Sequence, residues 1–250
     1  MRSVVKNHIY SLWAETALAL LAVLLFVCPS HANLLSNGSF EQPVATSGLN
    51  CGGIADCQGF NIGDPIGAGA WTVVGPGPTD PSKTPIVILT SAYNEGGYFF
   101  QPEDGNQSLD LTGMSNQGLN GVEQTVATIP GTDYSLSFWV GHHAQDPNFY
   151  NGPASVNLLI GGSLVGTFSN NHAPPPNLLD WEQFTYSFTA TGTTTTIDFF
   201  NAVADTSQNE VGLDNVALTA VPEPGSLPVL VSAISVLGLL GLGRRGAAPL

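Results

Sequence analysis

The sequence predicts an all-β protein, a two-sheet jelly-roll sandwich flanked by an N-terminal signal peptide and a C-terminal transmembrane helix. Apolar and polar residues alternate with a period of two at many places between residues 33 and 221, where helical periodicity is hard to find. Pro-Gly, Gly-Gly and Thr-Gly pairs separate these segments as turns. Apolar residues make up 43% of the chain, which is enough for a core. One sandwich domain over residues 33–220 accommodates the strands.

The strongest alternation covers residues 133–143, where one face carries Tyr134, Leu136, Phe138 and Val140. The opposite face of that segment carries Ser135, Ser137 and Trp139. Residues 181–190 place Phe184, Tyr186 and Phe188 on one face in the same way. Because side chains on a strand point alternately to opposite faces, the apolar sets are predicted to face the core. Further strands are expected at residues 156–160, 163–168, 194–200 and 211–218.

The N-terminus has the pattern of a secretory signal peptide over residues 1–32. Arg2 and Lys6 precede an apolar run at residues 17–27, and Ser30 and Ala32 occupy the −3 and −1 positions of a cleavage site. The alternatives are a membrane anchor, for which the run is short, and lipidation at Cys28.

The C-terminus carries an uncharged segment, residues 225–243, between a Pro-rich motif and two arginines. Residues 227–243 form about 26 Å of helix, just long enough to span a membrane. Arg244 and Arg245 follow and would lie on the cytoplasmic side. The alternative, a buried core helix, lacks the polar face that such a helix shows.

Together, Val221, Pro222, Glu223 and Pro224, the apolar segment and the arginine pair resemble the PEP-CTERM sorting signal of exopolysaccharide-producing Gram-negative bacteria. The resemblance covers residues 221–250. It implies that an exosortase in the inner membrane is a partner. It further implies an exported protein, anchored in the inner membrane and then delivered to the cell surface or extracellular matrix.

Cys51 and Cys57 remain after export and are six residues apart in a Gly-rich stretch. In an oxidising compartment such a pair most simply forms a disulfide. A metal site needs more ligands than two thiolates, and none follows nearby.

The charge of the chain excludes one class of function. Residues 33–221 hold 17 acidic residues and one basic residue, Lys83, so their net charge is −16. A protein that binds nucleic acid needs a basic face to neutralise phosphates. Nucleic acid is therefore excluded as a partner.

Several short pieces of the middle section, taken in order, resemble galactose-binding-like jelly rolls, including the DUF642 group and several carbohydrate-binding modules. They begin with residues 33–41, which match the opening strand of that fold, and include Ala70-Trp71. The later pieces lie at residues 104–111, 122–126, 130–138, 181–190 and 212–216.

The resemblance implies a structural Ca²⁺ ion between the first and last strands. Glu41 and Asp214 match the positions that supply carboxylates, which are the hard oxygen ligands calcium prefers. Alternatively, these two side chains cap turns or accept bonds from backbone N–H groups. His142 and His143 are adjacent in a strand and point to opposite faces, so they do not easily share one metal ion.

Sugar recognition is suggested by Trp139 and the loop after it. Trp139 lies on the polar face of its strand, and an indole stacks well on the apolar face of a pyranose. The predicted carbohydrate-binding residues are Trp139, His142, His143, Asn148 and Tyr150. Packing of Trp139 beneath the long loop is the competing interpretation.

No motif of a catalytic nucleophile, zinc protease or phosphate loop occurs, and no pair of carboxylates is singled out. The sequence therefore predicts a protein that is not an enzyme and that binds an exopolysaccharide or cell-wall glycan. The alternatives are a structural matrix protein without a defined ligand and a secreted glycan-active enzyme.

Overall fold

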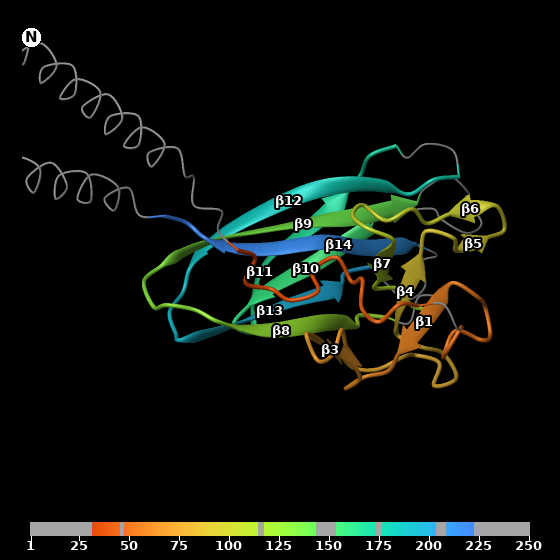
Figure 1. Ribbon diagram of the computed structural model, residues 1–250, viewed down its shortest axis with the longest axis horizontal. Coiled ribbons are helices and arrows are strands. Elements are labelled where there is room, and N and C mark those ends of the chain that lie inside the picture. The colour runs from red at the N-terminus through yellow and green to blue at the C-terminus, as the bar shows by residue number, and fades with distance from the viewer. Residues whose placement is uncertain are drawn as a thin grey trace, which may run out of the picture. The chain divides into compact units, whose positions relative to one another are not determined.

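The computed structural model describes residues 32–45, 48–114, 118–143, 154–173, 177–203 and 209–222, and these contain strands and no helix (Figure 1). The chain divides into two compact units, Met1–Ala32 and Asn33–Leu250. The predicted signal peptide, except Ala32, and the predicted helix at residues 227–243 lie outside the described residues. Within those residues, we find no helix of a length and hydropathy suited to crossing a membrane.

Two antiparallel sheets of six strands each form the sandwich in the second unit (Figure 1). Sheet A has the order β1 (Cys57–Phe60), β4 (Ile86–Thr90), β7 (Gln107–Asp110), β14 (Glu210–Ala220), β9 (Asp133–His143) and β12 (Asp180–Thr189). Sheet B has the order β11 (Ser163–Asn170), β10 (Ala154–Ile160), β13 (Thr194–Asn201), β8 (Gly121–Ala127), β3 (Trp71–Val74) and β2 (Pro65–Ile66). A separate hairpin pairs β5 (Asn94–Glu95) with β6 (Tyr98–Phe99). The predicted all-β sandwich is therefore confirmed.

Strand β9 has the bounds that its alternation predicts, and its two faces are as expected. Tyr134, Leu136, Phe138 and Val140 are buried in the main core between the sheets. Ser135, Ser137 and Trp139 are partly exposed on the opposite side, which we call the outer face of sheet A. Phe184, Tyr186 and Phe188 of β12 also pack against the core, as predicted.

An aromatic cluster joins the two sheets at the centre of the core. The ring of Phe138 lies 4.9 Å from that of Phe199 on β13 and 5.2 Å from that of Phe168 on β11. Phe184 of β12 completes the cluster, with its ring centre 5.9 Å from that of Phe138. Since the contacts are mostly edge-on or tilted, they match the geometry that aromatic pairs prefer.

The opening strand predicted at residues 33–41 is not present, and this prediction was wrong. Asn37 and Phe40 have φ angles of 52° and 50°, which are incompatible with an extended strand. The segment instead makes isolated bonds to β14: the N–H of Leu34 donates to the carbonyl of Leu218, and Asn33 Nδ2 donates to the carbonyl of Val216. Residues 33–41 therefore follow the edge of the last strand without a continuous ladder.

Phe138→Ala should lower the free energy of unfolding by about 3–5 kcal/mol, because it leaves a cavity among three aromatic rings from both sheets. Urea denaturation followed by tryptophan fluorescence measures the change. Ser187→Ala on the exposed side of β12 is the matched control and should stay within about 0.5 kcal/mol of wild type. Equal losses in the two variants would show that the cluster does not hold the sheets together.

Candidate functional site

The outer face of sheet A carries three neighbouring rows of side chains across strands β7, β14, β9 and β12. One row runs from Asp214 through Trp139 to Gln183. The next runs from Asp110 through Gly212 and Gly141 to Trp181. The third pairs Glu210 with His143. The two-residue period of the strands therefore gathers two indoles, three carboxyl groups and an imidazole on one face.

Two glycines make room for the indole of Trp181. A Cβ atom at Gly141 or at Gly212 would lie 2.9 Å from the six-membered ring of Trp181. Trp181 Nε1 donates a hydrogen bond of 2.9 Å to the carbonyl of Gln101. Because both positions lack a side chain, the ring lies across β9 and β14 and is held in place at its nitrogen.

Trp139 lies one pleat from Trp181 and is half-buried. Its cross-strand partner on β12 is Gln183, which is exposed, and Thr185 and Ser187 continue the exposed polar face along the same strand. Along this part of β12, Trp139 is therefore bordered by hydroxyl and amide groups rather than by other apolar side chains.

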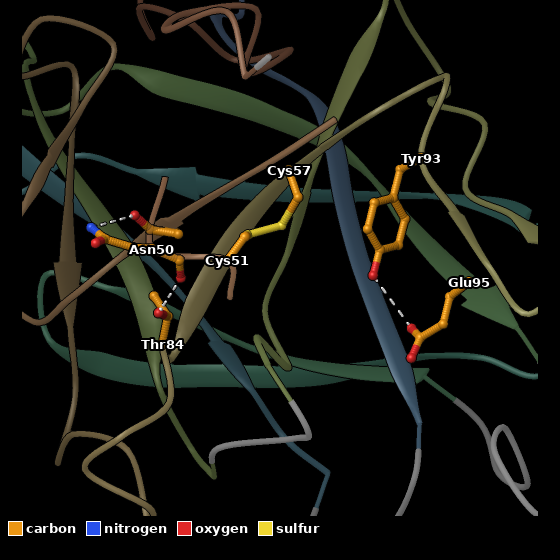
Figure 2. Close-up of a disulfide and its surroundings, with 7 residues drawn as sticks. Asn50, Cys51, Cys57, Thr84, Tyr93 and Glu95 are labelled. Carbon is orange, nitrogen blue, oxygen red and sulfur yellow. Dashed lines mark hydrogen bonds between the residues drawn. A yellow bond between two sulfur atoms is a disulfide. The ribbon is translucent and has the colours of Figure 1, made fainter. Parts of the chain in front are cut away.

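A second apolar cluster covers the β1–β4 end of this face, and we call it the hood. It contains Cys51, Cys57, Val87, Leu89, Tyr93, Phe100 and Leu179, with Tyr98, Met114 and Trp181 packed against it. Cys51 and Cys57 are joined in the predicted disulfide, which lies near Tyr93 in Figure 2. Asn50, beside Cys51, accepts a hydrogen bond from Thr84 Oγ1 at its carbonyl and donates from Nδ2 to the carbonyl of Gly59 (Figure 2). The disulfide loop is thus tied to the strands on which the hood packs.

Two buried carboxyl groups lie at the hooded end of the face. Burial raises the pKa of Asp110 to about 7, although its Oδ1 accepts hydrogen bonds from the N–H and hydroxyl of Thr112. Burial also raises the pKa of Glu210 well above its usual value, and the charges of Asp110 and Glu95 act in the same direction. Both groups therefore retain a proton at a pH where an exposed carboxyl is ionised.

Aromatic rings enclose the imidazole beside these carboxyl groups. The His143 ring lies 5.3 Å from that of Tyr98 and 5.2 Å from that of Phe100. Burial lowers the pKa of His143 to about 4, so this side chain is neutral near pH 7. Tyr93, whose hydroxyl donates to Glu95 Oε2 over 3.4 Å (Figure 2), has a pKa raised by burial.

Glu41 and Asp214, the predicted calcium ligands, both accept bonds from the backbone of residues 103–107. Glu41 Oε1 accepts from the N–H groups of Asn106 and Gln107 at 2.7 and 2.9 Å. Asp214 Oδ2 accepts from those of Glu103 and Asp104 at 2.9 and 3.0 Å. Burial raises the pKa of Asp214 to about 8, while these bonds oppose the rise. No group of three metal-ligating side chains occurs in the part of the chain that is described.

The other predicted site residues are not all brought together. His142 is 3% exposed and points to the inner side of sheet A, whereas His143 is fully buried under the hood. Neither histidine therefore forms an exposed rim with Trp139. Asn148 and Tyr150 lie outside the described residues, as do Glu223, Pro224, Arg244 and Arg245 of the sorting motif.

Sequence reasoning missed Asp110 and Glu210. Each lies next to a core residue, Leu109 or Val211, and therefore points to the outer face. The alternation of side chains along each strand was sufficient to predict that the two carboxyl groups point to the outer face. It gave no indication that the hood would bury the two groups.

Because Asp110 binds its proton more tightly when folded, the protein should lose stability as the pH rises from about 4 to about 7. Asp110→Asn keeps the oxygen that accepts from Thr112, and it should make the fall in the urea midpoint between pH 5 and pH 8 smaller. Glu210, which faces the same space with Glu95 and Tyr93, retains its own contribution. A pH profile of Asp110→Asn parallel to wild type, or an equal change in the exposed Asp80→Asn control, would contradict this expectation.

The comparisons with solved structures show the fold. The Stig cyclase Fisc from Fischerella sp. TAU, solved in complex with (3Z)-3-(1-methyl-2-pyrrolidinylidene)-3H-indole, is 22% identical. Its alignment covers 77% of this chain and 99% of that chain, with a TM-score of 0.50. Similar structures also include carbohydrate-binding modules. TmCBM61, solved with β-1,4-galactotriose, is 14% identical, and its alignment covers 76% of this chain and 99% of that chain with a TM-score of 0.44.

The sequence comparisons cover the same sandwich. Halomucin of Haloquadratum walsbyi is 25% identical over 202 residues, which are 79% of this chain and 2% of halomucin. The chain thus spans only about 2% of the length of that curated relative. The family described as HpiC1-like, HpiC1 cyclase, matches residues 32–219, the sandwich with its hooded face. The chain therefore belongs to the HpiC1-like family.

Proposed function

We propose that this protein binds a neutral extracellular polysaccharide on the outer face of sheet A. The observation that carries the proposal is Trp139, a half-buried indole on the solvent side of β9 with the exposed Gln183 opposite it. A pyranose stacked on that ring would bury its apolar face, while amide and hydroxyl groups bind its hydroxyls. The net charge of −16 over residues 33–221 disfavours an acidic glycan.

The proposed setting is outside the inner membrane. The pattern of residues 1–32 supports export, and the motif at residues 221–224 with Arg244 and Arg245 supports sorting by an exosortase. Delivery in this way would place the domain beside the exopolysaccharide or cell-wall glycan that it binds. The competing role is that of a structural matrix protein without a defined ligand.

Proton-donating chemistry is the second candidate, and the buried carboxyl groups of Asp110 and Glu210 favour it. An acid that retains its proton near neutral pH, as Asp110 does, is suited to general acid catalysis. The description of the family to which the chain belongs names a cyclase, and this membership supports the same alternative. Asp110→Asn separates the two functions, because acid catalysis requires that proton and glycan stacking on Trp139 does not.

Trp139→Ala in the full-length chain should weaken binding to a neutral polysaccharide at least tenfold, since the stacking surface is lost. A glycan array identifies the ligand, and titration calorimetry measures the dissociation constants. Leu164→Ala, which removes an exposed apolar side chain from sheet B, is the matched control and should change the affinity less than twofold. Saturable binding that survives Trp139→Ala would contradict the proposed face, and no binding to any glycan would favour the matrix role.

Calcium binding at Glu41 and Asp214 is a further part of the proposal, supported by the hydrogen bonds that place both carboxyl groups against the backbone of residues 103–107. An ion that binds only the folded form adds about 2.7 kcal/mol of stability at a hundredfold excess over Kd. Low millimolar Ca²⁺ should therefore raise Tm by a few degrees more than Na⁺ at matched ionic strength, and Asp214→Asn should remove the excess. Identical responses of the wild type and the variant would mean that Ca²⁺ only screens charge.

A further inference from the structure

A pocket lies away from the outer face of sheet A. It has a volume of about 640 Å³ and lies where the turn of β10 and β11 meets the turn of β12 and β13. Sites for small molecules have volumes of roughly 300–1,000 Å³. The pocket is therefore large enough for an organic ligand.

The walls of this pocket differ in chemistry. Ile160, Val165 and Phe188 form an apolar wall at the edge of the main core. Hydroxyl groups surround the rest of the pocket, from Ser163, Thr189, Thr191, Thr194 and Thr196. An apolar wall with a rim of hydroxyls suits a ligand that has one apolar face and several polar groups.

Two carboxyl groups, Asp198 and Glu123, also line the pocket and lie directly opposite each other on β13 and β8. Asp198 is only 6% exposed, and among the described residues its Oδ2 has no N–H or hydroxyl donor within hydrogen-bond distance. Its neighbour is the Glu123 carboxyl, and two carboxyls can bond to each other only through a shared proton. Burial, and then the charge and hydrogen bond of Glu123, raise the pKa of Asp198 to about 6.

Above that pH the Asp198 carboxyl is ionised, and its negative charge lies beside the carboxyl group of Glu123. Like charges directly opposite in a sheet are unfavourable, and burial increases the penalty. No lysine, arginine or histidine is among the described residues that line the pocket, and Lys83 is the sole lysine or arginine in residues 33–221. The described lining of the pocket therefore supplies no positive partner for the two carboxyl groups.

We infer that this pocket binds a cationic saccharide, with the ammonium group of an amino sugar held between Asp198 and Glu123. An ammonium has three N–H donors, which match the unpartnered Asp198 Oδ2, the Glu123 carboxylate and a neighbouring hydroxyl. Calcium takes six to eight oxygen ligands, whereas two carboxyl groups line this pocket. The hydroxyls of the sugar would contact Thr194 and Thr196, which lie on the same face of β13 as Asp198.

The test is titration calorimetry of the full-length chain with a glucosamine tetramer at neutral pH and physiological salt. The N-acetylated tetramer, which has the same length and no positive charge, is the ligand control. We expect saturable binding of the glucosamine tetramer that weakens at least tenfold in Asp198→Asn and in Glu123→Gln. In the Trp139→Ala background, which lacks the proposed face for neutral glycans, the N-acetylated tetramer should bind at least tenfold more weakly than the glucosamine tetramer.

Asp80→Asn is the matched protein control, because it removes one exposed carboxylate and keeps an amide oxygen for the turn that Asp80 caps. It should change the affinity less than twofold. If all three variants bound the glucosamine tetramer equally weakly, the binding would depend only on net charge, and the inference would be overturned. Binding of CaCl₂ alone with the same sensitivity to Asp198→Asn would assign the pair to an inorganic cation and also overturn it. Thermal unfolding shows whether each variant is folded. If Asp198→Asn does not fold, the affinity of Glu123→Gln tests the inference in its place. Trp139→Ala should leave this binding intact, so the failure of one site is distinguishable from the failure of the other.

Discussion

The alternation of side chains along β9 is the constraint on which the rest of the structure depends. This strand lies between β14 and β12 in sheet A, and its inward residue Phe138 contacts aromatic rings from both sheets. A shift of one residue would move Phe138 to solvent and Trp139 into the core. The core contacts of β9 therefore also determine which side chains are available on the outer face.

Glycine has a specific role on that face. Gly141 on β9 and Gly212 on β14 are partners in the ladder, and the Trp181 ring occupies the space above both. With a side chain at either position, the indole could not occupy this space. The hood then packs against Trp181, which joins the disulfide loop to the strands of sheet A.

Buried carboxyl groups are unusual in a domain with so few cations, and the protein accommodates them in different ways. Asp214 accepts the backbone N–H groups of Glu103 and Asp104, and Asp110 accepts from Thr112. Asp198 lies beside another carboxyl group, that of Glu123. In Asp214 and Asp110, donors within the chain form hydrogen bonds to the carboxyl oxygens. The charge of Asp198 is instead offset by a proton or by an external cation. Family membership alone does not choose between binding and catalysis, because a common fold supports both.

The sequence alone determined the fold class, the bounds of β9, the inward faces of β9 and β12, and the pairing of Cys51 with Cys57. Each of these follows from local information: a two-residue period, or two cysteines six residues apart. The broken opening segment at residues 33–41 required tertiary structure, because Asn37 and Phe40 take left-handed angles where the chain bends beside β14. Burial of His143, Asp110 and Glu210 required it as well. A strand pattern indicates the face to which a side chain points, but only the packing of the hood, from segments far apart in the chain, decides whether water reaches that face.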